Sequence, residues 1–326
     1  MKDGSFRVRT MLPEEVALAV DWAAAEGWNP GLTDASCFAA AAPDGFLLGE
    51  FAGKPAAILS VVNYDEHFSF LGFYIVRPDL RGRGLGLRIW QAGMARAGSR
   101  AIGLDGVVAQ QDNYRKSGFV FAYNNIRYGG WVGPLVDPAP TTVSVTELSF
   151  DLIKRDDATV FPAARPTFLY TWIAAPGHVG RALMRDGRLV AWGVIRPCRM
   201  GRKIGPLVAD DRDAAETVFA ALVGPSGGQV FLDVPQPNGA AVALATTRGL
   251  GAGVRDCADV LRSDPAGFIG ASIRRDDVRT GIGRSFTCRD RAPLKHIVSS
   301  PRGPTNVRFW HLADIPLHLV DVCYWG

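Results

Sequence analysis

The sequence predicts an α/β fold built on mixed sheets, with two related domains in tandem and a C-terminal extension. Three observations lead to this prediction. The chain has 326 residues, which is enough for two domains. Apolar runs of strand length alternate with segments of helical periodicity. A strand, an asparagine, a helix and a glycine follow one another near residues 104–119 and again near residues 229–250, which indicates an internal repeat.

The first half begins with a strand at residues 6–10 and a helix from Pro13 to about Glu26. Gly27 and the Trp-Asn-Pro-Gly stretch after it break this helix. Strands are expected at residues 46–51, 56–64, 68–76 and 104–109. Gly98 is placed to end a helix between the last two strands, whose apolar face comprises Leu87, Trp90, Met94 and Ala97.

A glycine-rich turn separates the strand at residues 68–76 from that helix. Backbone N–H groups in such a turn can converge on an anion, and Gly84 and Gly86 leave room for a phosphate. A P-loop is excluded, because Leu87 and Arg88 stand where it needs Lys and Ser or Thr. A Rossmann turn has a suitable acidic residue in Asp105, but its first glycine would lie too far from the strand and Leu87 would occupy its third glycine position.

The turn itself reads Arg81-x-x-Gly84-x-Gly86 after Val76-x-Pro78, which resembles the acyl-CoA signature of the GNAT superfamily of N-acetyltransferases. The resemblance implies the GNAT fold and acetyl-CoA as cosubstrate, with no metal. In that family the strand before the turn offers backbone groups to the pantetheine arm, and the N–H groups of the turn hold the pyrophosphate at the positive end of the helix dipole. The corresponding residues are Tyr74, Ile75, Val76, Arg81, Gly82, Arg83, Gly84, Leu85 and Gly86.

A second motif, Tyr114-x-x-x-Gly118-Phe119, is similar to the family segment whose tyrosine protonates the departing CoA thiolate. The resemblance therefore implies that Tyr114 is the general acid, and an unperturbed tyrosine with a pKa of about 10 is protonated at neutral pH. Asn113 is placed to hydrogen-bond the pantetheine or the surroundings of Tyr114. The resemblance covers roughly residues 6–262 and is greatest to a tandem subgroup with a degenerate second domain.

The general base and the acceptor side are less clear in the sequence. The strand at residues 68–76 has no carboxylate, so Asp105 is the preferred base, with Asp65, Glu66 and His67 nearby and a water relay left open. Asp105 stands on an otherwise apolar strand, where a carboxylate is costly to bury unless it is hydrogen-bonded. The family builds its acceptor side where Trp28 and Asn29 stand in this sequence, so these two residues are expected to contact the substrate.

The proposed division is an N-terminal acyl-CoA-binding domain at residues 1–133, a linker at 134–150, a second domain at 151–286 and an atypical tail at 287–326. In the second domain we expect a helix over residues 211–223, begun by aspartates, and strands at residues 168–174, 189–195 and 229–234. Residues 205–211, where the glycine turn is expected to recur, lack the signature, and Ala245 replaces the tyrosine. The second domain is therefore expected to cover the acceptor site rather than to bind CoA.

Composition narrows the remaining possibilities. The net charge of +4 is too small to predict nucleic-acid binding. The N-terminal sequence has no signal-like apolar segment, and no apolar run is long enough to span a membrane. The five cysteines are scattered and form no zinc or disulfide pattern, and the histidines of the tail have no ligand spacing. A cytoplasmic protein, monomeric or homodimeric, is the simplest expectation.

The sequence therefore predicts an N-acetyltransferase that transfers an acetyl group from acetyl-CoA to a primary amine by direct attack. The acceptor, either a small molecule or a protein, is left open. The alternative is a non-catalytic CoA-binding sensor or interaction module, because no base is evident and the second domain is degenerate.

Overall fold

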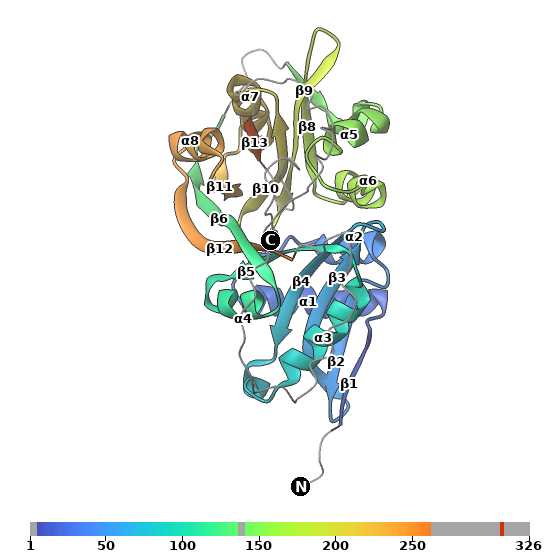
Figure 1. Ribbon diagram of the computed structural model, residues 1–326. Coiled ribbons are helices and arrows are strands. Elements are labelled where there is room, and N and C mark those ends of the chain that lie inside the picture. Colours follow the sequence, from blue (N-terminus) through green and yellow to red (C-terminus); the bar gives the residue numbers. More distant parts are fainter. Residues whose placement is uncertain (1–4, 136–140, 262–306, 310–326) are drawn as a thin grey trace, which may run out of the picture.

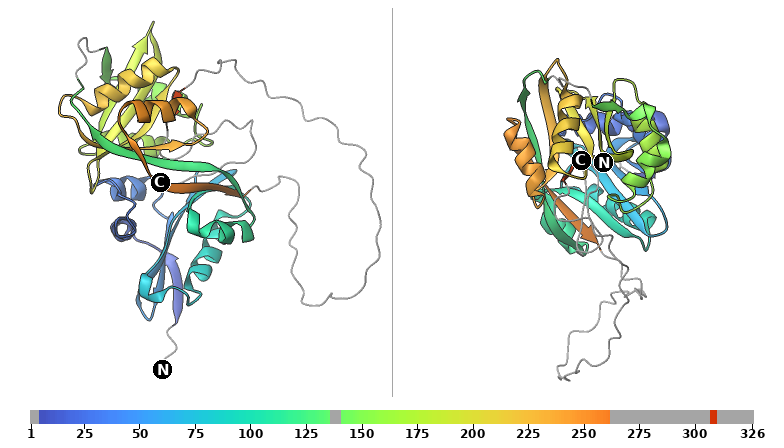
Figure 2. Two further views of the ribbon diagram at one scale, coloured as in Figure 1. Left: turned by 90° about the vertical axis from the view of Figure 1, so that its left-hand side faces the viewer. Right: turned by 90° about the horizontal axis from the view of Figure 1, so that it is seen from above.

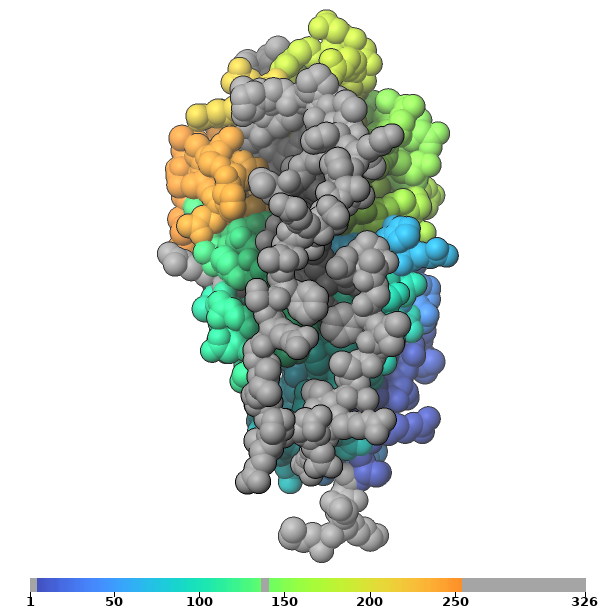
Figure 3. Space-filling model, in the orientation of Figure 1, coloured from blue at the N-terminus to red at the C-terminus, as the bar shows by residue number. Residues whose placement is uncertain are grey.

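The computed structural model describes residues 5–135, 141–261 and 307–309, which form two halves stacked one on the other (Figures 1 and 3). The strands of the first half are β1 (Phe6–Thr10), β2 (Phe46–Phe51), β3 (Lys54–Asn63), β4 (Phe68–Val76) and β5 (Ala101–Val107). Its helices are α1 (Val16–Ala25), α2 (Asp34–Ala41), α3 (Leu85–Ala97) and α4 (Gln111–Lys116).

The second half is entered through the long strand β6 (Phe119–Val132). It continues with β7 (Thr142–Ser144), β8 (Val179–Arg185), β9 (Arg188–Pro197), β10 (Arg202–Ala209), β11 (Gly228–Pro235), β12 (Gly251–Leu261) and β13 (Val307–Phe309). Its helices are α5 (Phe150–Asp157), α6 (Pro166–Ala174), α7 (Arg212–Val223) and α8 (Gly239–Thr247). The stretch expected to be a linker therefore contains the short strand β7.

The two halves share strands across one continuous sheet, in the order β1-β2-β3-β4-β5-β12-β6-β11-β10-β9-β8-β7, with β13 beside β10. β6 pairs along β11, and β12 inserts between β6 and β5 of the first half. Figure 2 shows β6 crossing from one half to the other. The hydrogen-bonded ladder therefore ties the second half to the edge of the first-half sheet.

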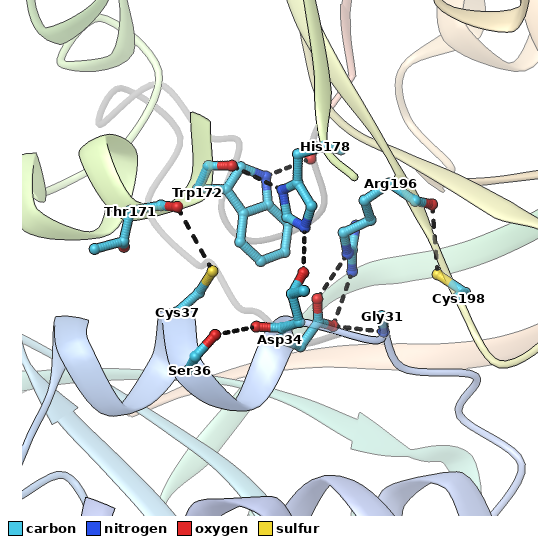
Figure 4. A network of polar contacts seen from close by, with 11 residues as sticks. Gly31, Asp34, Ser36, Cys37, Thr171, Trp172, His178, Arg196 and Cys198 are labelled. Carbon is cyan, nitrogen blue, oxygen red and sulfur yellow. Dashed lines mark hydrogen bonds and ion pairs between the residues drawn. The ribbon is translucent and has the colours of Figure 1, made fainter. Parts of the chain in front are cut away.

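A polar cluster fixes the second contact between the halves (Figure 4). The Arg196 guanidinium of β9 donates to both carboxylate oxygens of Asp34 on α2, at 2.9 and 3.3 Å, and both residues are buried. Burial pushes the pKa of Asp34 upward, but Arg196 and the Gly31 N–H together hold that pKa below its usual value. A side chain at Gly31 would place its Cβ 2.3 Å from the Asp34 carboxylate, so only glycine fits there.

The buried apolar residues form two clusters, and one of them spans both halves. One cluster joins the first-half sheet to α5 and α6, through residues such as Phe73, Phe168 and Trp172. A second cluster lies in the second-half sheet with α7 and α8. Among the described residues, no helix combines the length and hydrophobicity needed to cross a bilayer.

Most of the predicted elements are confirmed. The strands expected at residues 6–10, 46–51 and 68–76 have those bounds, and those expected at 189–195 and 229–234 lie within β9 and β11. The 211–223 helix is confirmed as α7, and its cap is Asp211, which accepts a hydrogen bond from the Ala214 N–H at 2.8 Å. Gly98 ends α3 as expected.

Three predictions were wrong. Residues 168–174 are not a strand but part of α6, because Pro166 starts a helix and Phe168, Leu169 and Trp172 bury one helical face. Leu87 does not face the core of the sheet. It is 59% exposed, and the buried face of α3 instead carries Leu85, Ile89, Trp90, Gly93 and Ala97. Most of the stretch at residues 205–211 is strand β10 rather than a turn.

Candidate functional site

The site begins where two parallel strands separate. β4 pairs with β5 only from Phe68 opposite Ala101 to Leu71 opposite Leu104. Just past that point the backbone of Phe73 is left-handed, with φ 48°, and two residues of β4 stand opposite one residue of β3. A left-handed phenylalanine is strained, so the surrounding packing holds this bulge in place. The bulge turns the end of β4 away from β5 and opens a gap between them.

The glycine-rich turn lies at the end of β4 that separates from β5. Gly82 and Gly84 have φ values of 76° and 75°, and Gly84 is the N-cap of α3. A Cβ on either residue would meet no atom within 4 Å, so the turn is open on that side and backbone conformation is what requires glycine. Gly86 has a different reason, because its Cβ would lie 2.6 Å from the Tyr74 hydroxyl. Gly86 is therefore explained by its packing against Tyr74, whereas the sequence had suggested that it leaves room for a phosphate.

The turn lines a groove of about 500 Å³. Two of its lining residues, Arg81 and Lys116, are basic, and its lining set contains no acidic residue. The backbone N–H groups at the start of α3 add positive potential to the same place. The remaining lining residues are Tyr74, Val76, Leu80, Gly82, Gly84, Leu85, Gly86, Leu87, Trp90, Asn113, Tyr114 and Ser117. Such a groove fits an extended ligand with an anionic end.

A cavity of about 410 Å³ lies beside the groove, between the separated strands. The two share Tyr74, Val76, Arg81, Trp90 and Tyr114 in their walls. The residues that line only the cavity are Glu26, Trp28, Leu59, Leu71, Gly72, Phe73, Ile75, Leu104, Asp105, Val107, Ala109, Gln110 and Arg127. The cavity is therefore largely aromatic and aliphatic, with four charged side chains in its wall counting Arg81.

Tyr114 stands on the wall common to the groove and the cavity. It is buried in α4, and its ring contacts Trp90 and Phe119 at centroid distances of 5.7 and 6.3 Å. The ring also lies against the backbone of β5, because a Cβ at Gly106 would come within 2.2 Å of its Cε2 atom. These contacts on several sides hold the ring in a fixed position.

The other residues expected near the cosubstrate differ in position, and Arg83 lines neither the groove nor the cavity. Residues Tyr74, Ile75 and Val76, at the separated end of β4, line the cavity. The Arg83 guanidinium lies over the Phe51 ring, 5.3 Å from its centroid, so its side chain packs on the end of β2. Asn113 is exposed in the groove wall and donates to the Gln110 side chain at 2.7 Å.

Asp105 is the one expected base that lines the cavity. It is half-buried and accepts a hydrogen bond from the Asn125 side-chain amide at 3.3 Å. Asp65 instead caps the β3–β4 turn through the N–H groups of His67 and Phe68, and it does not line the cavity. Sequence reasoning missed the Glu26 carboxylate, which lines the cavity at the end of α1.

Trp28 and Asn29, the two residues expected on the acceptor side, lie in different surroundings. Trp28 lines the cavity, with its ring 6.3 Å from that of Phe73. Asn29 does not line it, because its side-chain amide both donates to and accepts from the backbone of Met200, at 2.9 and 2.8 Å. The structure therefore corrects Asn29 from a substrate residue to a contact between the two halves.

Arg127 was also missed by sequence reasoning. This buried β6 residue makes a two-point ion pair with Asp233 of β11, at 2.6 and 2.8 Å, and donates to the Trp28 carbonyl at 2.7 Å. It lines the cavity as well. The second half therefore supports one wall of the cavity. No group of three His, Cys, Asp or Glu side chains that could hold a metal ion occurs in the described part of the chain.

Two family models and a curated relative match this sequence. Residues 14–119 match the model of the acetyltransferase (GNAT) family, and residues 153–265 match that of an acetyltransferase (GNAT) domain. Over 224 residues, 68% of this chain and 76% of the relative, the chain is 32% identical to a protein named holothin acyltransferase from Pseudoalteromonas sp. (strain SANK 73390).

Solved structures show the same fold. A putative acetyltransferase from Pyrococcus horikoshii superposes with a TM-score of 0.66 and 20% identity, covering 81% of this chain and 91% of that one. A tandem GNAT protein from the clavulanic acid biosynthesis pathway superposes with a TM-score of 0.56 and 13% identity, covering 81% and 100%. At these identities the likeness concerns the fold alone.

Proposed function

The chain belongs to the GNAT family of N-acyltransferases, with two GNAT domains in tandem, and we propose that it transfers the acetyl group of acetyl-CoA to the amine of a small molecule. One observation carries the proposal. The Tyr114 phenol stands on the wall shared by a basic groove and a largely apolar cavity. This is where a donor in the groove and an acceptor in the cavity would meet.

The groove has the features that CoA requires. The turn at Gly82 and Gly84 is open, Arg81 and Lys116 in the groove wall are basic, and the start of α3 favours a diphosphate there. Beyond Leu71, β4 has no ladder to β5 within the two described strands, so its backbone N–H and C=O groups can pair with the pantetheine amides. The thioester would then reach the gap between the strands.

Acyl transfer requires two proton transfers, one to the departing thiolate and one from the amine. As the new C–N bond forms and the C–S bond breaks, Tyr114 gives its proton to the thiolate, which leaves as the free thiol. The amine must lose a proton, and Asp105 is placed in the cavity wall to take it directly or through a water molecule. The separated strands hold donor and acceptor together, which removes most of the entropic cost of their encounter.

We propose a small molecule rather than a protein lysine as the acceptor. The cavity of about 410 Å³ falls within the range of small-molecule sites, and Trp28 and Phe73 give it flat apolar walls. The relative named holothin acyltransferase is named for acyl transfer to holothin, and we propose an acceptor of that kind for this chain.

Substitution of Tyr114 by Phe tests the proposal. We expect turnover to fall about ten-fold or more, by the usual weight of acid catalysis, while CoA affinity in calorimetry is kept. Turnover is measured as thiol release from acetyl-CoA with a panel of small amines. Tyr170→Phe, at a tyrosine that is 65% exposed, is the matched control.

Two outcomes would count against the proposal. Unchanged turnover and pH–rate profile in the Tyr114→Phe variant would remove Tyr114 from the mechanism. Tight CoA binding by the wild-type protein with no acetylation of any amine would favour the sensor alternative.

A further inference from the structure

Arg81 links the groove to the cavity through its side chain. It lines both, and its Nε donates to the Val76 carbonyl at 2.9 Å. Its Nη2 forms an ion pair with the Glu26 carboxylate at the end of α1. A single guanidinium therefore hydrogen-bonds a backbone carbonyl at the edge of β4 and forms an ion pair with a carboxylate of the cavity wall.

The two spaces differ in the charges of their walls. The groove is lined by Arg81 and Lys116 with no acidic residue, whereas the cavity wall has the carboxylates of Glu26 and Asp105 beside Arg81 and Arg127, and Arg127 is paired with Asp233. The groove therefore favours an anion, and Glu26 would favour a cation if Arg81 were not paired with it. The pair is exchangeable, because its side chains are 50% and 30% exposed and surface ion pairs are weak.

We propose that Glu26 receives the acceptor as its ammonium ion, and that Arg81 blocks it until CoA is bound. This rests on the proposed CoA site. The diphosphate, with more negative charge than one carboxylate, draws the Arg81 guanidinium toward the turn. That movement frees the Glu26 carboxylate for the acceptor and the Val76 carbonyl for a pantetheine amide.

The exchange has a thermodynamic consequence. CoA and Glu26 compete for the same guanidinium, so breaking the ion pair opposes CoA binding. By linkage, a bound CoA raises the affinity of the cavity for an ammonium ion, and the acceptor raises the affinity for CoA by the same factor. Glu26 thus acts by positioning the amine, and CoA is expected to bind before it.

The exchange can be tested with CoA alone, by calorimetry at low ionic strength. Glu26→Gln removes the competing carboxylate, so we expect CoA to bind about two- to five-fold more tightly, the range set by an exposed ion pair. Arg81→Met should weaken CoA binding, and adding Glu26→Gln to it should change the affinity little. Glu14→Gln removes an exposed carboxylate elsewhere on the first half and should leave CoA affinity unchanged.

The outcomes separate this inference from the proposed function. If wild-type protein does not bind CoA, both are wrong. If it binds CoA and Glu26→Gln binds no more tightly, only the exchange is wrong. A gain that persists in the Arg81→Met background, or that Glu14→Gln reproduces, would show a general charge effect and would also overturn the exchange.

Discussion

The position of the Tyr114 ring depends on the absence of a side chain at Gly106. The ring lies against β5, so a Cβ at Gly106 would stand 2.2 Å from its Cε2 atom and 2.7 Å from its Cδ2 atom. Gly106→Ala is therefore a way to move the phenol without touching its chemistry. We expect it to reduce turnover strongly while the protein stays folded.

The size of the effect follows from the contact distances. Moving Cε2 from 2.2 Å to the 3.4 Å where ordinary contact begins takes about 1.2 Å. Gly106 is paired with Cys257 of β12, whereas β4 pairs with β5 only as far as Leu104, so we expect the ring to move more than the paired strand. A misplacement of about 1 Å at a reacting group can cost on the order of 100-fold in rate. Overpacking of this kind lowers the free energy of unfolding by about 1–3 kcal/mol.

The assay is thiol release from acetyl-CoA under saturating amine, together with urea unfolding and CoA calorimetry. Gly103→Ala on the same strand is the matched control, because its Cβ would approach Phe70 no closer than 3.2 Å. We expect Gly106→Ala to lose about 100-fold in turnover, and Gly103→Ala to lose little. Combining Gly106→Ala with Tyr114→Phe should cost no more than the larger single loss. Near-normal turnover in a folded Gly106→Ala protein would refute this reasoning.

Two further predictions concern the contacts between the halves. Asp233→Asn should lower the free energy of unfolding by about 3–5 kcal/mol, because it removes the carboxylate opposite the buried Arg127 guanidinium. Chemical denaturation measures this loss, and a loss below about 1 kcal/mol would contradict it. His178 of the second half hydrogen-bonds the Thr33 hydroxyl of the first half at 2.8 Å. Burial lowers the pKa of His178 from 6.5 to about 4, so the unfolded chain takes up the proton first and stability should fall as the pH drops from about 6.5 to about 4. Urea midpoints across that range should fall less for His178→Gln, and an unchanged fall would exclude His178 as the cause.

The sequence predicted the first half well because its information is local. The turn at Gly82 and Gly84 takes left-handed backbone that glycine adopts readily, and Gly98 ends a helix by the same property. Apolar runs of strand length bounded by turns identified the strands at 46–51 and 68–76. Each of these features is decided within a few residues of chain.

Helix α6 was missed because its apolar residues suit two structures. Phe168, Leu169 and Trp172 are aromatic or bulky, which favours a strand in isolation. They form a helix because one face packs on the core shared with the first half, where the Phe168 and Trp172 rings are 5.0 Å apart. Tertiary packing decided between the two, and it is not visible in a window of nine residues.

The cavity residues that the sequence did not identify come from distant segments. Glu26 ends a helix and Arg127 lies in a long strand, and neither belongs to a motif. Each becomes notable only through a partner far along the chain, Arg81 for Glu26 and Asp233 for Arg127. Asn29 shows the reverse case, since its position suggested substrate contact and its amide is used by Met200.

The shared strands explain why the second half can lack the acyl-CoA signature and still be needed. Asp233 of the second half holds Arg127, and Arg127 holds the carbonyl of Trp28 in the cavity wall. β12 covers the edge of β5, the strand against which the Tyr114 ring lies. An uncovered β5 would expose unpaired backbone groups and loosen the support of the ring. The second half therefore supports both the wall of the cavity and the strand against which the Tyr114 ring lies.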